Sequence, residues 1–181
     1  SDFEGLKIRV GGGVVNDVTK ALGITSLLKP APESFELLNA GVADGVFFPK
    51  ESVKSFKLEH LIKFATFVPG GLYNTSFALV MNPAKFDSLS KEDQAAVMKV
   101  SGEHFSALAG KAWDAADQAG IAAMKAAGVE IDTASPELVA AIKSKTDPIE
   151  NAWYAEAKAK GIDGPAVVAA LRAEIKQVAG K

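Results

Sequence analysis

Short apolar segments alternate with glycine or proline turns over the first 82 residues of the chain. Residues 6–10 alternate apolar and basic side chains, which predicts a strand, and glycines 11–13 separate it from a short helix over residues 14–22. The same succession predicts strands over residues 25–29, 42–48, 61–68 and 73–82, and helices over residues 33–40 and 51–56. Strands and helices that alternate at this spacing are typical of a parallel sheet.

From residue 83 onward the chain is rich in alanine, lysine and glutamate, which favours helix. Ser90 and Asp93 approximate a capping box, and only isolated glycines interrupt the helical pattern over residues 91–127. A straight helix of this length would span about 55 Å, against a width of about 30 Å for a compact domain. We therefore expect a kink near Gly102 or Gly110.

The last 54 residues predict one more short strand and two helices. The strand covers residues 129–131, and Ser135-Pro136 begins the first helix with proline at its first position. Asp147-Pro148 is expected to interrupt or restart that helix, and a final helix runs over residues 164–179. The whole pattern predicts the α/β class.

Composition excludes several kinds of protein. With 181 residues, 48% hydrophobic and 23% charged, the chain is suited to one globular domain, or a domain and part of another. The net charge of −2 gives no excess of basic residues for binding nucleic acid. The longest apolar run, residues 41–49, is interrupted by Asp44 and is too short for a membrane helix.

Catalytic and metal-binding residues are scarce. The chain has no cysteine and two histidines, His60 and His104, neither in a metal-binding spacing, so we expect no metal site, no cofactor and no enzyme activity. The lack of cysteine suits the periplasm and the cytosol alike. No signal peptide is visible, and the opening Ser1-Asp2-Phe3 just before a strand is what a mature periplasmic protein, or a piece of one, would have.

Arg9 is the most informative charged residue. It lies near the carboxyl end of the first predicted strand, just before the glycines, and ligands of open α/β sheets bind outside such strand ends. A guanidinium there is a natural bidentate partner for a carboxylate or phosphate, although a salt bridge at the sheet edge is equally open. Arg172, the only other arginine, is expected to be an exposed residue of the last helix.

The turn over Gly11–Gly13 offers an alternative function. A strand, a glycine turn and a helix resemble a phosphate-binding turn in outline, which would make the protein a nucleotide-binding α/β enzyme. However, Asn16 stands at the third glycine position of the dinucleotide motif, and the second strand lacks an acidic ribose partner. A helical interaction module over residues 90–181 is a third interpretation.

Four further residues could face a ligand. Phe47 and Phe48 end the third predicted strand, and because neighbours point to opposite faces of a strand, one could be core and the other cleft, or both core. Tyr73 and Asn74 follow the turn at Gly70-Gly71 and could present polar groups to a ligand, or be ordinary residues at the start of a strand.

Three stretches together resemble the TRAP-transporter solute-binding proteins of the DctP family. They are Leu6–Arg9, Ala40–Gly45 with Pro49 after it, and Leu79–Asn82 leading through Phe86–Leu89 into the long helix. The resemblance implies a periplasmic-binding-protein-like lobe with a parallel-rich sheet, a long spanning helix and C-terminal helices. It implies a periplasmic receptor that closes around an organic acid and delivers it to a membrane permease.

The resemblance also implies roles for individual residues. Arg9 falls on the family's carboxylate-clamping arginine, and Phe48 falls where many members have an asparagine. Loss of that amide argues against polyhydroxylated ligands, and Phe47 with Phe48 would form an apolar wall that suits an aromatic or branched-chain acid. Tyr73 and Asn74 fall where the chain recrosses between lobes and lines the cleft.

Family members are much longer, so the chain resembles a C-terminal fragment. The resemblance implies that residues 1–73 form most of lobe two, residues 74–128 a crossover strand and long helix shared with lobe one, and residues 129–181 a strand and helices on lobe two. Apolar surface meant for the missing N-terminal segment would then be exposed, and either that segment or self-association should cover it.

Overall fold

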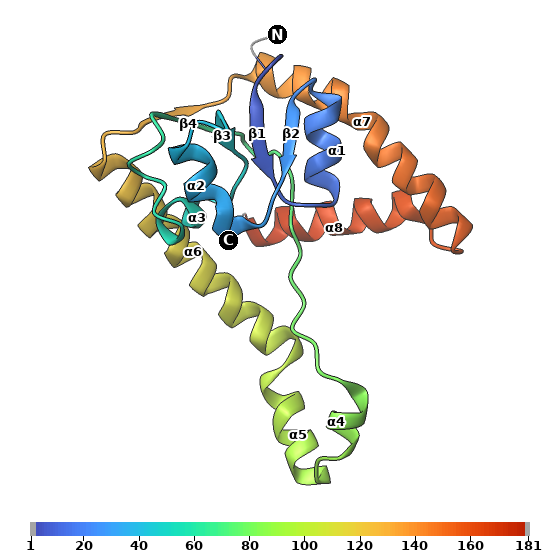
Figure 1. Ribbon diagram of the computed structural model, residues 1–181. Coiled ribbons are helices and arrows are strands. Elements are labelled where there is room, and N and C mark those ends of the chain that lie inside the picture. Colours follow the sequence, from blue (N-terminus) through green and yellow to red (C-terminus); the bar gives the residue numbers. More distant parts are fainter. Residues whose placement is uncertain (1–2, 180–181) are drawn as a thin grey trace.

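The computed structural model describes residues 3–179, which have an α/β architecture with two small parallel sheets (Figure 1). The first sheet has the order β2-β1-β3, where β1 (Lys7–Val10) pairs with β2 (Thr25–Leu28) and with β3 (Gly45–Val46). The second sheet pairs β4 (Phe64–Phe67) with β5 (Glu130–Thr133). The predicted α/β class and the parallel pairing are confirmed.

Short helices follow the strands of the first sheet. They are α1 (Val14–Ala21) after β1, η1 (Ala31–Glu33) and α2 (Ser34–Asn39) after β2, and α3 (Lys50–Ser55) after β3. The strand predicted over residues 42–48 is much shorter as β3. The reason is that Val42 and Ala43 donate their N–H groups to the carbonyl of Leu37 and so close the end of α2.

The first core cluster lies on one face of β1. Ile8 and Val10 point to this face, where they pack with residues of α1 and with Ile142 of the C-terminal helix α7 (Pro136–Ala159). A second cluster forms around Leu58 and Met124, beside the β4–β5 sheet. Because side chains alternate along a strand, Arg9 points to the opposite face of β1 from Ile8 and Val10.

The predicted strand over residues 73–82 is wrong. In the structure this segment is extended but belongs to neither sheet, and it runs as a connector to α4 (Pro83–Asp87) (Figure 1). The strand-like sequence has no neighbouring strand within residues 3–179 to pair its N–H and C=O groups.

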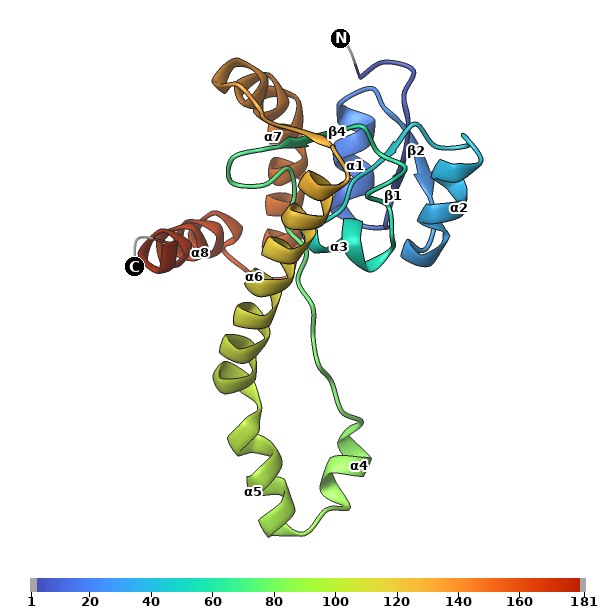
Figure 2. The ribbon, with the colours of Figure 1, turned by 90° about the vertical axis from the view of Figure 1, so that its left-hand side faces the viewer.

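The expected kink in the long helix is confirmed at Gly102. α5 (Lys91–Val100) and α6 (Gly102–Ala126) are separated where Ser101 is extended, with ψ −172°, and Gly102 has φ +59°. Ser90 caps α5, as the capping box predicts, by accepting the N–H of Asp93 at 3.0 Å. The connector, α4, α5 and the first part of α6 project away from the sheets in two perpendicular views (Figures 1 and 2). We call residues 74–116 the arm and the other described residues the body.

Two long helices complete the body. α7 passes through Pro148 as one helix, so the predicted interruption there is wrong, and α8 (Gly164–Ala179) follows. Helix α7 packs against α1 and against α8, and both Ile142 and Ile149, which lie on either side of Pro148, pack in or on the first core cluster. Among residues 3–179 the helices are too short or too polar to cross a membrane.

Candidate functional site

Arg9 lies next to the carboxyl end of the central strand of the first sheet. Its strand is paired on both sides, with Leu27 of β2 and Val46 of β3 opposite Arg9 itself. The residue is 4% exposed, which is unusual for arginine, since charged residues are rarely buried without a partner. The sheet therefore fixes the backbone of Arg9 and directs its side chain to the face opposite the first core cluster.

The backbone of Lys29 accepts two hydrogen bonds from Arg9. Nε and Nη2 both donate to the Lys29 carbonyl, at 2.9 and 2.6 Å, just after β2 ends. This carbonyl occupies the side edge of the guanidinium fork, formed by Nε–H and one N–H of Nη2. The end-on edge, with one N–H from each Nη nitrogen, keeps the geometry that binds a carboxylate through two parallel hydrogen bonds.

Two aromatic rings lie beside the guanidinium. Arg9 Cζ is 4.5 Å from the centre of the Phe48 ring, a cation–π contact, and Phe48 is stacked on Phe56 with ring centres 5.4 Å apart and an angle of 11°. The backbone fixes this arrangement, because the N–H of Phe47 donates to the Arg9 carbonyl at 3.1 Å. Each strand of the sheet thus contributes to the surroundings of Arg9. β1 carries Arg9 itself, Lys29 follows β2, and Phe48 follows β3.

The charge of Arg9 is not neutralised within residues 3–179. The ion pairs of the described residues involve other cations, and none joins a carboxylate to Arg9. Burial lowers the pKa of Arg9, while Tyr73 and Glu33 raise it by weaker electrostatic interactions. A buried cation without an ion-pair partner is unfavourable, and Glu33 pairs with Lys29 at 3.4 Å instead, so an anion bound at the end-on edge of Arg9 would be stabilised.

The other predicted site residues divide into two groups. Tyr73 is half-buried beside Arg9, its hydroxyl donates to the carbonyl of Phe47 at 3.2 Å, and burial raises its pKa. The structure therefore brings Arg9, Phe48 and Tyr73 together. The side chain of Phe47 packs, like that of Tyr73, against the first core cluster, and Asn74 is exposed at the start of the connector.

Sequence reasoning missed Phe56 and the Lys29 carbonyl. Phe56 follows α3, eight residues after Phe48, and the six-residue helix between them folds the chain back so that the two rings meet. The signal for Lys29 was available, since Lys29-Pro30 ends the second predicted strand beside the first one. The direction of a carbonyl group, however, cannot be read from a sequence.

The glycine turn joins β1 to α1, and the two cavities of the described residues lie elsewhere in the body. Gly13 has φ +77° and precedes α1, where Asn16 accepts a hydrogen bond from Ser26 Oγ at 2.9 Å. A cavity of about 610 Å³ lies between the end of α7 and the start of α8, and one of about 70 Å³ lies between α1 and α7. Neither cavity is lined by Arg9, Phe48 or Tyr73.

The chain belongs to family 7 of the bacterial extracellular solute-binding proteins, the DctP family, whose sequence profile matches residues 1–157. Three known proteins illustrate the similarity. A crystal structure of a TRAP periplasmic solute-binding protein from Bordetella bronchiseptica, with bound (R)- and (S)-mandelate, is 52% identical and has a TM-score of 0.92. The match covers 98% of this chain and 56% of that one.

The second is a crystal structure of a marine metagenome TRAP solute-binding protein specific for aromatic acid ligands, in complex with metahydroxyphenylacetate. It is 34% identical with a TM-score of 0.84, and the match covers 92% of this chain and 53% of that one. The curated protein TsaT of Comamonas testosteroni, described as an outer membrane transporter protein, is 26% identical over 95% of this chain and 51% of its own length. The chain thus spans about half the length of these relatives. Members of the family are solute-binding receptors rather than enzymes.

Proposed function

We propose that this chain is the C-terminal part of a periplasmic TRAP receptor that binds an organic carboxylate through Arg9 and delivers it to a membrane permease. The observation that carries the proposal is the buried side chain of Arg9, 4% exposed, with its side edge occupied by Lys29 and no ion pair to a carboxylate among the described residues. A site of this kind binds an anion without first breaking an internal ion pair.

The ligand class we propose is an aromatic carboxylate. Phe48 and Phe56 give the surroundings of Arg9 an apolar, aromatic character, which suits an acid with few polar groups. The protein from B. bronchiseptica, which is 52% identical to this chain over the matched region, has mandelate bound. A small arylacetic or hydroxyarylacetic acid satisfies both the charge of Arg9 and the aromatic rings beside it.

Tyr73 and Asn74 would line the cleft from the crossing between the two lobes. Tyr73 is linked to the third strand end by its hydrogen bond to the Phe47 carbonyl, so it is fixed relative to Arg9. Asn74 is exposed, so its amide is available to a ligand or to the other lobe. Phe47 would contribute to the cleft wall through its backbone rather than through its ring, which packs in the core.

We further propose that residues 1–73 form most of lobe two, that residues 74–128 are shared between lobes, and that residues 129–181 pack on lobe two. Leu79 and Val80 of the arm are 76% and 82% exposed. Side chains this apolar suit a buried interface. The part of the longer relatives that this chain does not span, or a second copy of the chain, would cover them and close the cleft over Arg9.

Calorimetric titration of the receptor at the full length of its relatives tests the function. The panel is mandelate, 3-hydroxyphenylacetate, glucuronate, NAD and ATP. We expect the two aromatic acids to bind with micromolar or tighter affinity and glucuronate at least about 10-fold more weakly, a difference of about 1.4 kcal/mol. Binding of NAD or ATP without binding of any carboxylate would contradict the proposal and favour a nucleotide-binding protein.

A further inference from the structure

We propose that Phe56 is a positioning residue for Arg9, acting through the ring of Phe48 and without touching the ligand. The inference rests on the proposed function for its importance to binding, but the positioning itself is a property of the protein alone. The proposal rests on three groups: the guanidinium of Arg9, the ring of Phe48 with its centre 4.5 Å from Arg9 Cζ, and the ring of Phe56 with its centre 5.4 Å from that of Phe48.

The Lys29 carbonyl alone does not fix the guanidinium plane. Both hydrogen bonds end on the same oxygen atom, so the group can still tilt about that oxygen. The Phe48 ring lies against the guanidinium and restricts this tilt. The direction of the end-on edge is therefore fixed while the Phe48 ring stays in its position, and it would vary if that ring moved.

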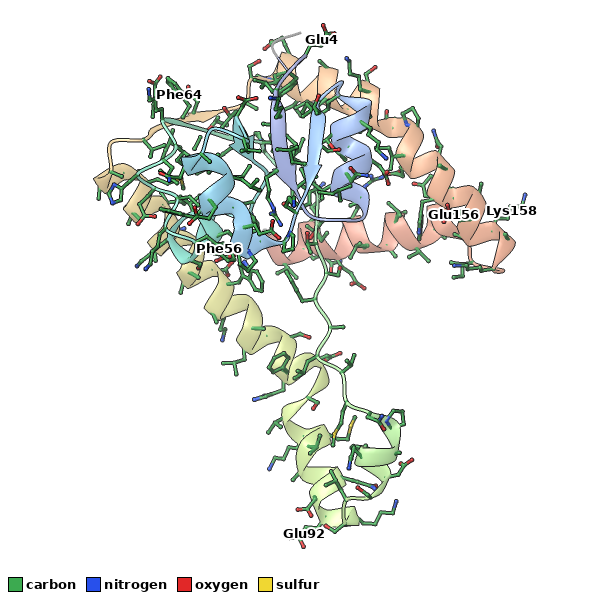
Figure 3. All side chains as sticks on the ribbon, in the orientation of Figure 1. Glu4, Phe56, Phe64, Glu92, Glu156 and Lys158 are labelled. Carbon is green, nitrogen blue, oxygen red and sulfur yellow. The ribbon has the colours of Figure 1, made fainter. Side chains whose placement is uncertain are left out.

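Phe56 holds the Phe48 ring in place. The two rings are nearly parallel, at 11°, so Phe56 covers a face of Phe48 and blocks the space into which that ring could rotate. Both rings pack beside the second core cluster, and Figure 3 shows Phe56 at the lower edge of the body, near α3. An aliphatic side chain at position 56 would leave that face of Phe48 incompletely covered.

Helix α3 is itself firmly attached, which makes the position of Phe56 well defined. The N–H of Glu51 donates to Asp117 Oδ1 of α6 at 3.0 Å. At Gly120 the backbone of α6 lies so close that a Cβ atom there would be 2.2 Å from the Lys50 carbonyl. Phe56, Phe48 and Arg9 therefore form a row of side chains. The contact of α3 with α6 fixes the Phe56 end of this row, and the guanidinium of Arg9 is its other end.

Phe67 provides a matched control within the same protein. It also packs beside the second core cluster, and Lys50 Nζ lies 5.0 Å from its ring centre, so it too forms a cation–π contact. Phe67 has no contact with Arg9 or Phe48 among the aromatic and cation–π pairs of the described residues. A Phe67→Leu substitution thus removes a comparable ring that contacts the Lys50 side chain but is stacked on neither Phe48 nor Arg9.

Proton exchange at Arg9 Nε–H, followed by NMR on the full-length receptor without ligand, tests the positioning directly. We expect Phe56→Leu to speed this exchange about 5-fold or more, Phe56→Tyr to restore the slow exchange, and Phe67→Leu to leave it within 2-fold of the parent. Unchanged exchange in Phe56→Leu, or equally fast exchange in Phe67→Leu, would overturn the proposal.

Mandelate titration of the same variants tests the consequence for binding. Phe56→Leu is expected to weaken mandelate binding about 5-fold in the parent and not at all in an Arg9→Lys background, because its effect passes through the guanidinium. An equal loss in both backgrounds would mean direct contact with the ligand and would overturn the proposal. If no carboxylate binds the parent but the exchange results hold, the proposed function fails while the positioning role stands.

Discussion

The body and the arm differ in what covers their apolar side chains. In the body, Leu58 and Met124 are 0% and 1% exposed, and each of the two core clusters is built from body residues. In the arm, no described residue is fully buried, although Phe77, Leu79 and Val80 are apolar. The arm's own aromatic contact is the stacking of Phe77 on Trp113, with ring centres 4.8 Å apart.

This difference shows which part of the chain is stabilised by its own contacts. The body buries enough apolar surface to define the position of Arg9, whereas the arm is an extended connector and a kinked helix pair with exposed apolar side chains. The free energy of unfolding of the chain should therefore depend on the body and hardly on the arm.

The largest expected contrast is between two identical truncations. Leu58→Ala in the body should lower the free energy of unfolding of this chain by about 3 kcal/mol, since it leaves a cavity in the second core cluster. Leu79→Ala in the arm, at a side chain 76% exposed, should change it by less than about 0.5 kcal/mol. Urea denaturation followed by circular dichroism measures both, and equal losses would show that the arm is packed against something in solution.

A smaller contrast lies within α6, which passes from the arm into the body. Gly120→Ala places a methyl group 2.2 Å from the Lys50 carbonyl and should destabilise the chain by about 1–3 kcal/mol. Gly110→Ala, with no atom within 4 Å of the added Cβ, should instead stabilise it by about 0.5 kcal/mol through helix propensity. The melting temperatures of the two variants should move in opposite directions, and a neutral Gly120→Ala would refute the close contact of α3 with α6.

The smallest expected effect concerns a surface network in the body. Glu150 accepts hydrogen bonds from Tyr154 and Arg172, which lower the pKa of its carboxyl below the ordinary value of 4.5. A lowered pKa in the folded state gives stability that is complete above the unfolded value and is lost as pH falls through the folded value. The contribution should stay below about 1 kcal/mol because the Glu150 side chain is 36% exposed and solvent screens its interactions.

Thermal melts between pH 7 and pH 3 test this linkage. The parent should lose stability more steeply below about pH 4.5 than Glu150→Gln does. Glu156→Gln, at an exposed carboxylate of the same helix, is the control and should follow the parent. Identical pH profiles for the parent and Glu150→Gln would show that the network does not persist in solution.

Local patterns predicted most of the elements, and the errors have distinct physical causes. The strand over residues 73–82 failed because a strand needs a partner, which no local pattern reveals. Pro148 was expected to interrupt α7, but packing against α1 and α8 outweighs the loss of one backbone hydrogen bond. β3 is shorter than predicted because the N–H groups of Val42 and Ala43 donate to the Leu37 carbonyl at the end of α2.

Two members of the candidate site could be predicted from the sequence, because residue type and position at a strand end identify them. Arg9 stood out as an arginine at a strand end, and Phe48 as one of two aromatic residues at another. Phe56 could not be found, because its contact depends on how α3 turns the chain back over eight residues. The Lys29 carbonyl is a backbone group and has no signature in the side-chain sequence.

The central claim is that Arg9 recognises a carboxylate, and the ratio of mandelate to mandelamide affinity measures this most directly. Calorimetric titration of the full-length receptor should give a ratio of about 100, since two charge-assisted hydrogen bonds distinguish the acid from its uncharged amide. In Arg9→Ala the ratio should fall to about 1, while Arg172→Ala should keep the parent value. A ratio that stays near 100 in Arg9→Ala would contradict the account, because another cation would then bind the carboxylate.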